Sequence, residues 1–166
     1  LISYIEKKYK SSKILALKRP RRLSFVGVDL KRTIEYVNSQ IDFKSKYEIF
    51  IVHSIEAPFI TTQYIESAIN TYKIFDVDCV IAVREDDSYY FKHQGKGMVP
   101  INYSESLLKY EKEKYYVATT GFLLRKTDSF FENQKMLGSS IGHVVLDKKA
   151  SFFIKDDLDE KIANVI

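Results

Sequence analysis

Residues 47–70 constrain the fold more than any other segment, because an apolar run, a polar exit and a helical pattern follow one another directly. Ile49-Phe-Ile-Val52 is a continuous apolar run, typical of a strand in the centre of a parallel sheet. Thr61 or Thr62 can cap the helix that follows. Ligands of open α/β sheets bind just past the carboxyl ends of strands, so the exit at residues 53–58 is the predicted ligand site.

The remainder of the chain continues this alternation of strands and helices. Residues 14–17 and 77–83 are apolar runs of strand length, and residues 29–40 carry a helical pattern that Asp29 can cap. The resulting order is that of right-handed βαβ units. The second half is predicted to add a β-hairpin at 88–101, strands at 115–120, 121–124, 141–146 and 151–154, and helices at 128–136 and 157–166.

These elements predict an α/β fold with a three-layer, Rossmann-like arrangement, a mostly parallel sheet and a β-hairpin insertion. The 166 residues suit a single domain spanning 1–166. A helix-like segment opens the chain with no strand before it, so we expect the C-terminal part of a longer domain whose first βα unit is absent. The last helix is expected to start with a capping box at Asp157 and Glu160 and to bury Leu158 and Ile162.

Composition excludes several classes of protein. Hydrophobic residues make up 45% of the chain, which indicates a globular protein, and no apolar run approaches the roughly 18–20 residues of a membrane span. The formal net charge of +4 is too small and too dispersed for a nucleic-acid footprint. Cys79 is the lone cysteine, which favours a reducing, cytoplasmic setting, and its place in an apolar run predicts a buried core residue.

Five strings, taken in order, resemble the acylneuraminate (CMP-sialic acid) cytidylyltransferases, and together they cover nearly the whole chain. They are Arg19-Pro-Arg-Arg-Leu-Ser24, the exit Ile51-Val-His-Ser-Ile-Glu-Ala-Pro-Phe-Ile-Thr61, Asp76-Val-Asp-Cys-Val-Ile-Ala-Val83, Thr119-Thr-Gly-Phe-Leu-Leu124 and the closing segment 151–163. The resemblance implies a nucleotidyltransferase fold and transfer of CMP from CTP to a sialic-acid-like sugar acid, with Mg²⁺ as cofactor. It also implies a homodimer formed through the hairpin region.

The same resemblance implies roles for particular residues. Arg84 and Arg19 would be catalytic. Substrate would be bound by Ser54, Lys92, His93 and Phe122, and the metal by Glu56, Asp156 and Asp157. Structural readings stay open beside these roles: a solvated loop for Arg19 and Glu56, an exposed hairpin tip for Lys92 and His93, a core position for Phe122, and helix capping for Asp156 and Asp157.

Two departures from that family leave activity open. The family's A-R-x-G-S-K-G loop, which wraps the nucleotide, is absent, and its two closing aspartates fall on Phe153 and Lys155. One alternative is therefore a non-catalytic, nucleotidyltransferase-like module. Another is a relative of the methylerythritol phosphate cytidylyltransferases, because residues 53–61 resemble their H-D-A-A-R-P-F-I/V-T segment, although their Asp falls on Ser54 and their Arg on Ala57.

Overall fold

A computed structural model describes residues 2–9, 13–25, 27–103 and 114–166. The chain divides into two compact units. Unit 1 comprises the described residues up to Ile49 together with Lys126–Met136, and unit 2 comprises those of Phe50–Arg125 and Leu137–Ile166. Within the part of the chain that the structure describes, no helix is both long enough and apolar enough to cross a bilayer.

Unit 1 is helical. It holds α1 (Ile2–Lys8), the 3₁₀ turn η1 (Arg21–Leu23), α2 (Leu30–Ile41) and α4 (Thr127–Asn133). The predicted cap of α2 is confirmed, since Asp29 accepts a hydrogen bond of 2.9 Å from the Lys31 backbone N–H. The strand predicted at 14–17 is wrong: these residues have no regular structure, and Ile14 and Leu15 expose their side chains instead of burying them in a sheet.

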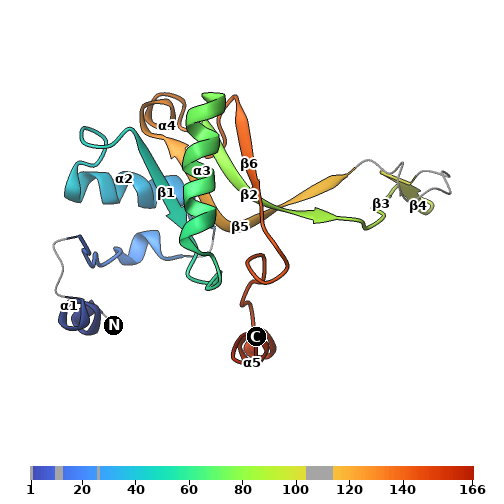
Figure 1. The fold of residues 1–166 in the computed structure, drawn as a ribbon, viewed down its shortest axis with the longest axis horizontal. Coiled ribbons are helices and arrows are strands. Elements are labelled where there is room, and N and C mark those ends of the chain that lie inside the picture. The colour runs from blue at the N-terminus through green and yellow to red at the C-terminus, as the bar shows by residue number, and fades with distance from the viewer. Residues whose placement is uncertain (1, 10–12, 26, 104–113) are drawn as a thin grey trace. The chain divides into compact units, whose positions relative to one another are not determined.

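Unit 2 is built around most of a four-stranded sheet (Figure 1). Its strands are β1 (Ile49–His53), β2 (Cys79–Asp86), β5 (Tyr115–Lys126) and β6 (Ile141–Val145), in the spatial order β1-β5-β2-β6. Helix α3 (Thr62–Phe75) packs on β2 and β6 through one face that includes Ala68 and Tyr72. The predicted α/β class is confirmed by this layer of helix on sheet.

The predicted mostly parallel sheet is not confirmed. Strand β2 pairs in parallel with β6 but antiparallel with β5, and the antiparallel register runs from Cys79–Arg125 to Asp86–Tyr115 with a bulge between Ile81 and Val83. The two strands predicted at 115–120 and 121–124 form one long strand, β5, which includes Gly121.

The predicted hairpin is present at the end of an arm in unit 2. The arm is formed by β2 and β5 where they extend beyond the packed sheet, and the hairpin consists of β3 (Phe91–His93) and β4 (Met98–Pro100) (Figure 1). Gly95 has a φ of 63°, which suits glycine, and the Gln94 N–H donates to the Gly97 carbonyl at 2.8 Å. Where β2 ends, next to the hairpin, hydrogen bonds from Ser88 and Tyr90 lower the pKa of Asp86 to about 2.

The closing segment differs from its prediction. Residues 151–154 form no strand, and α5 spans Asp157–Ala163. Its cap is Asp156 instead of Asp157, and the Asp156 carboxylate accepts hydrogen bonds of 2.9 Å from the N–H groups of Leu158 and Asp159. The expected burial of Leu158 and Ile162 is wrong, because they are 64% and 40% exposed.

A fully buried arginine joins the strands of unit 2 at one end of the sheet. The Arg125 guanidinium donates 2.6 Å to the carbonyl oxygen of Asp78 and lies 4.0 Å from its carboxylate. That carboxylate also accepts bonds from the Ser139 N–H and hydroxyl, at 2.8 and 2.9 Å. Arg125, Asp78 and residues 138–140 are called the buried junction below. Because a buried cation needs partners, the junction fixes where β2, β5 and β6 begin or end.

We expect Gly138→Ala to destabilise the protein by about 1–3 kcal/mol, because overpacking forces buried groups apart. A Cβ at this position would overlap the Cβ of Asp78 and lie 2.9 Å from Arg125 Nη1. Gly97→Ala is the control, since a Cβ there meets nothing within 4 Å. Urea unfolding of both variants measures the difference in free energy, and equal stabilities would show that the buried junction tolerates expansion.

Candidate functional site

The exit from β1 is a tight turn held by one carbonyl group. The Gly121 carbonyl of β5 accepts a hydrogen bond of 3.1 Å from the Ser54 N–H, and His53 Nδ1 lies 2.8 Å from the same oxygen. The Ala57 N–H then donates to the Ser54 carbonyl at 3.1 Å, which closes the turn. Ala57 is 1% exposed, so its methyl group packs inside the turn. His53 therefore has a structural partner at the end of its strand.

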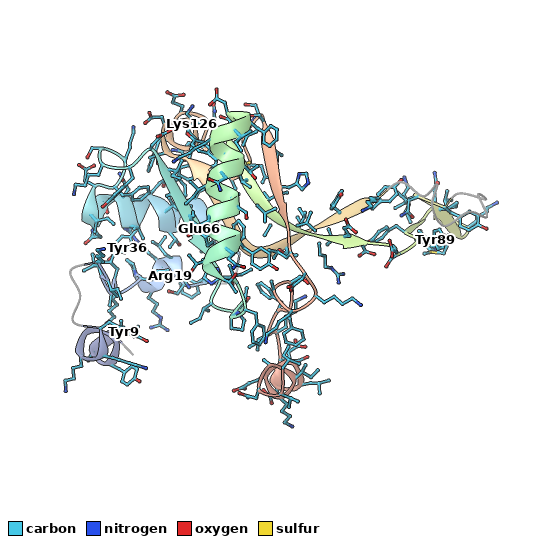
Figure 2. The ribbon with its side chains drawn as sticks, in the orientation of Figure 1. Tyr9, Arg19, Tyr36, Glu66, Tyr89 and Lys126 are labelled. Carbon is cyan, nitrogen blue, oxygen red and sulfur yellow. The ribbon has the colours of Figure 1, made fainter. Side chains whose placement is uncertain are left out.

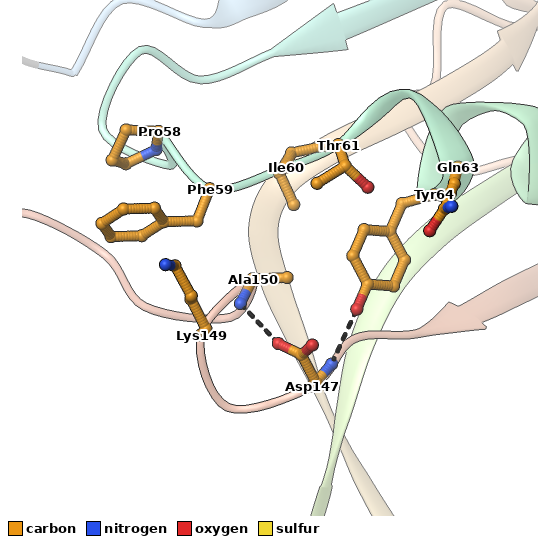
Figure 3. Close-up of a pocket in the computed structure, with 9 residues that line it drawn as sticks. All are labelled: Pro58, Phe59, Ile60, Thr61, Gln63, Tyr64, Asp147, Lys149 and Ala150. Atoms are coloured by element: carbon orange, nitrogen blue, oxygen red, sulfur yellow. Dashed lines mark hydrogen bonds between the residues drawn. The ribbon is translucent and has the colours of Figure 1, made fainter. Parts of the chain in front are cut away.

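A pocket of about 470 Å³ lies beside this turn, entirely within unit 2 (Figure 3). One wall is the segment that leads into α3, and the other is the loop that follows β6. It is therefore located at the carboxyl ends of two strands and at the N-terminus of a helix, the position expected of a ligand site in an α/β sheet. The lining residues are Pro58, Phe59, Ile60, Thr61, Gln63, Tyr64, Asp147, Lys149 and Ala150.

Hydrogen bonds shape the loop after β6. The Ala150 N–H donates 2.7 Å to the Asp147 carboxylate, and the Asp147 N–H lies 3.5 Å from the Tyr64 hydroxyl oxygen (Figure 3). The bond from Ala150, followed by that from Tyr64, lowers the pKa of Asp147 below its usual range. Burial raises the pKa of Tyr64, so this phenol stays protonated, and its oxygen accepts the hydrogen bond from the Asp147 N–H.

The pocket has two features that suit an anionic ligand. The first turn of α3 presents backbone N–H groups, and Thr61 at the N-cap makes no side-chain capping bond, so its hydroxyl is not used for capping. Lys149 supplies a cation, whose ammonium donates 2.6 Å to the Ile166 carbonyl and lies 5.1 Å from the centre of the Phe59 ring. Asp147 opposes this charge, so a ligand here must offer hydrogen-bond donors as well as an anion.

Some of the predicted site residues lie close to this pocket. Ser54 and Glu56 belong to the turn that leads into it, and the Ile154 N–H donates 2.9 Å to the Glu56 carbonyl, which brings the segment before α5 alongside. Asp156 and Asp157 follow two and three residues later in that segment. The predicted metal residues therefore lie in two segments of unit 2 that this backbone hydrogen bond joins.

These carboxylates do not form a ready-made metal site. Among the described residues, no group of three His, Cys, Asp or Glu side chains is placed to hold an ion. The Asp156 carboxylate is already used by two backbone N–H groups as a helix cap. Mg²⁺ usually takes one or two carboxylates plus substrate phosphates, so the predicted magnesium requirement stays a prediction and no step below depends on it.

The other predicted residues are placed elsewhere. Arg84 lies on the arm and pairs with Asp86 at 3.3 Å, while Lys92 and His93 are exposed on the hairpin. Phe122 is buried in the core of unit 2. Arg19 belongs to unit 1, where its Nε donates 3.2 Å to the Ser24 hydroxyl. The predicted set is thus spread over the exit turn, the arm, the core and a loop of unit 1.

Sequence reasoning missed Tyr64, Asp147 and Lys149. The signal that identified the exit of β1 was present for β6 as well, because Asp147 and the two lysines after it directly follow the apolar run 141–146. Polar residues at the end of a buried strand mark a ligand edge. Tyr64 was not singled out, because its aromatic ring suits the packed face of a helix and only its hydroxyl group is polar.

The fold of the chain is similar to the folds of two solved cytidylyltransferases. The chain matches the structure of 4-diphosphocytidyl-2C-methyl-D-erythritol synthase from Anaerococcus prevotii with a TM-score of 0.66 and 14% identity, over 99% of this chain and 74% of that one. It matches 2-C-methyl-D-erythritol 4-phosphate cytidylyltransferase from Thermus thermophilus with a TM-score of 0.54 and 11% identity, over 90% and 76% of the two chains. No protein-family profile and no curated protein matches the chain.

Identities this low establish the fold alone. The two structures favour the resemblance of residues 53–61 to methylerythritol phosphate cytidylyltransferases over the resemblance to CMP-sialic acid synthetases, which they do not confirm. Two side chains of that segment still differ. Ser54 stands where that resemblance expects Asp, and the buried Ala57 stands where it expects Arg.

We expect Ala57→Arg to destabilise the protein by roughly 3 kcal/mol or more, because an unpaired cation would enter a buried position. Ser54→Asp restores the other expected residue at a half-buried position, and we expect it to change stability by less than about 1 kcal/mol. Thermal and urea unfolding measure both. A stable Ala57→Arg protein would mean that the exit turn can open to admit the family's arginine.

Proposed function

We propose that this chain is a cytidylyltransferase that transfers CMP from CTP to the phosphate group of a phosphorylated polyol of the 2-C-methyl-D-erythritol 4-phosphate type. The observation that carries the proposal is the exit segment 53–61. It resembles the corresponding segment of the methylerythritol phosphate enzymes, and it lies beside a pocket at the strand ends of a fold shared with two of them.

The proposed reaction is an in-line displacement at the α-phosphorus of CTP. An oxygen of the acceptor's phosphate group forms a bond to this phosphorus, the bond to the bridging oxygen breaks, and pyrophosphate leaves with the electron pair. The product carries a diphosphate between cytidine and the polyol, and the attacking oxygen is already ionised at neutral pH, so no hydroxyl proton has to move. Positioning of the two substrates and neutralisation of phosphate charge supply most of the rate of such reactions.

In this proposal the pocket beside α3 receives the phosphate group of the acceptor. The first N–H groups of α3 and the Lys149 ammonium face an anion, while Gln63 and Asp147 are available to the hydroxyl groups of a polyol. An acceptor with both a phosphate and hydroxyl groups therefore matches the mixed charge of the lining. A sugar acid would offer the Lys149 ammonium a carboxylate, which carries less negative charge than a phosphate group.

The direct test is a substrate panel with the purified protein, CTP and Mg²⁺. We expect pyrophosphate release with 2-C-methyl-D-erythritol 4-phosphate and none above background with N-acetylneuraminic acid. Release with the sugar acid alone would instead support the CMP-sialic acid alternative. CTP binding by calorimetry without release for any acceptor would support the non-catalytic module that the departures at Phe153 and Lys155 suggested.

We expect Lys149→Gln to weaken binding of the acceptor roughly tenfold, because it removes one charge-assisted hydrogen bond to phosphate. Lys148→Gln is the matched control: it removes the same charge from the neighbouring exposed residue, which does not line the pocket. Calorimetric titration with the acceptor measures the dissociation constants. Equal effects of the two substitutions would contradict a specific role for Lys149.

The arm supports a second part of the proposal, a homodimer. The arm exposes many large apolar side chains, and a contiguous apolar surface of this kind is typical of a protein–protein interface. These side chains are Tyr89, Phe91, Met98, Val99, Ile101, Tyr103, Tyr115 and Tyr116. Tyr89 and Tyr103 have ring centroids 5.3 Å apart (Tyr89 is labelled in Figure 2). A second copy of the chain is the partner that this part of unit 2 would take.

We expect the protein to sediment as a dimer and the double substitution Phe91→Ser, Met98→Ser to weaken dimerisation at least roughly thirtyfold, as loss of central apolar contacts does. The control is Ile74→Ser, Phe75→Ser, which removes two exposed apolar side chains from the end of α3. Analytical ultracentrifugation over a concentration series gives the dissociation constants. A monomeric wild type, or a control that dissociates equally, would contradict the proposed role of the arm.

A further inference from the structure

Unit 1 holds a second pocket, of about 430 Å³, that the proposed function does not use. It lies between η1 and one face of α2. Arg32, Glu35, Tyr36 and Ser39 are spaced three and four residues apart, so they project from the same face of the helix. Arg22 and Leu23 of η1 complete the lining.

The wall opposite α2 is fixed by hydrogen bonds. The Tyr36 hydroxyl donates 3.0 Å to the Lys18 carbonyl and so ties α2 to the loop before η1. Figure 2 shows Tyr36 and Arg19 in this part of unit 1. The Leu23 N–H donates 2.9 Å to the Pro20 carbonyl, and the Leu23 side chain is buried. The pocket is therefore bordered by ordered backbone and not by a free loop.

The charge of the lining is unbalanced. Arg22 and Arg32 form no ion pair with a carboxylate of the described residues, and Glu35 is the single acid among the lining side chains. The nearby acid at the start of α2, Asp29, caps the helix and pairs with Lys31 at 3.0 Å. Arg32 also attracts the Asp29 carboxylate, whose pKa is lowered mainly by hydrogen bonds from Lys31. Two guanidinium groups that line a concave surface and form no salt bridge with the described residues suit a bound oxyanion, because each offers a planar fork of N–H donors.

We propose that this pocket binds a small phosphomonoester with a hydroxylated body. Arg22 and Arg32 hold the phosphate, Leu23 contacts the carbon skeleton, and Glu35 and Ser39 hydrogen-bond the hydroxyl groups. A phosphomonoester carries a charge of about −1.5 to −2 at pH 7, which matches two arginines better than a carboxylate does. The site is formed by unit 1 residues alone and does not depend on the proposed function.

Glu35 distinguishes this ligand from a nucleic acid. A nucleic acid binds along an extended basic stripe through many phosphates, and a carboxylate in its path would repel it. In a small ligand with a single phosphate, a neighbouring hydroxyl group can instead donate a hydrogen bond to the Glu35 carboxylate. The pocket thus combines one anion-binding end and one hydroxyl-binding end.

The test is calorimetric titration of the full chain with inorganic phosphate and with glycerol 3-phosphate. We expect saturable binding of both and tighter binding of glycerol 3-phosphate. Arg22→Gln and Arg32→Gln should each weaken glycerol 3-phosphate at least roughly tenfold, since each removes a charged hydrogen-bonding group. Arg21→Gln is the matched control, because it removes the same charge from η1 at a residue outside the lining, and we expect a change below about twofold.

Glu35→Gln separates the two ends of the pocket. We expect it to strengthen binding of inorganic phosphate and to reduce the preference for glycerol 3-phosphate, because it removes both a repulsive charge and a strong acceptor. If Arg22→Gln lowers the melting temperature, Arg22→Lys keeps the charge without the fork and should lose part of the affinity. Glycerol 3-phosphate is itself a phosphorylated polyol, so under the proposed function the pocket beside α3 would also take it. Binding that Arg22→Gln and Arg32→Gln weaken and Lys149→Gln does not weaken belongs to the pocket in unit 1, whereas binding that only Lys149→Gln weakens belongs to the pocket beside α3. The failure of either proposal is therefore distinguishable from the failure of the other.

Three results would overturn the proposal. They are absence of saturable binding by either probe at millimolar concentration, equal losses for Arg21→Gln and the two lining substitutions, and tighter binding of single-stranded RNA than of glycerol 3-phosphate.

Discussion

The architecture of unit 2 depends on one buried cation. Arg125 is fully buried and reaches the carbonyl group of Asp78, whose carboxylate in turn holds Ser139. Breaking one side of such a pair leaves the other charge without solvent or partner, at a cost of several kcal/mol. The pairings Cys79–Arg125 and Cys79–Ile141 start beside this group, so it sets the register of β2 with both neighbours. A shift by one residue would turn every buried side chain of β2 to the opposite face.

A fixed register matters because the candidate site lies at the other end of the strands. β1 ends where Gly121 of β5 accepts from Ser54, and β6 ends where Asp147 turns toward Ala150. The strands between them bring the two exits to one edge of the sheet, where contacts such as that between Lys149 and the Phe59 ring join their loops. The pocket beside α3 therefore depends on the sheet register as well as on these loop contacts.

The sequence predicted the parts of this structure whose signals are local. The apolar run before His53, the cap at Asp29 and the turn at Gly95 each contain their own physical reason, and all three were found where expected. The antiparallel placement of β5 was not predictable in the same way, since an apolar strand buried on both faces reads alike in either direction. Residues 14–17 and 151–154 have the composition of strands but pair with no strand in the structure, and pairing depends on tertiary contacts that the local sequence does not show. The residues predicted for the site do not lie together in the structure. The motifs that suggested them give only the order of residues along the chain, whereas a pocket requires residues that are close in space.

The exit turn differs in charge from the methylerythritol phosphate segment that residues 53–61 resemble. A turn held by the Gly121 carbonyl requires a compact Ala57, and a buried methyl group there leaves no room for the arginine of the methylerythritol phosphate segment. The cation of the neighbouring pocket comes instead from Lys149, on a loop that follows a different strand. A phosphate bound beside α3, as we propose, would therefore meet a cation from the exit of β6 and not from the exit of β1. Either placement suits an anion at this edge of the sheet, because the N-terminus of α3 and a nearby ammonium both stabilise negative charge.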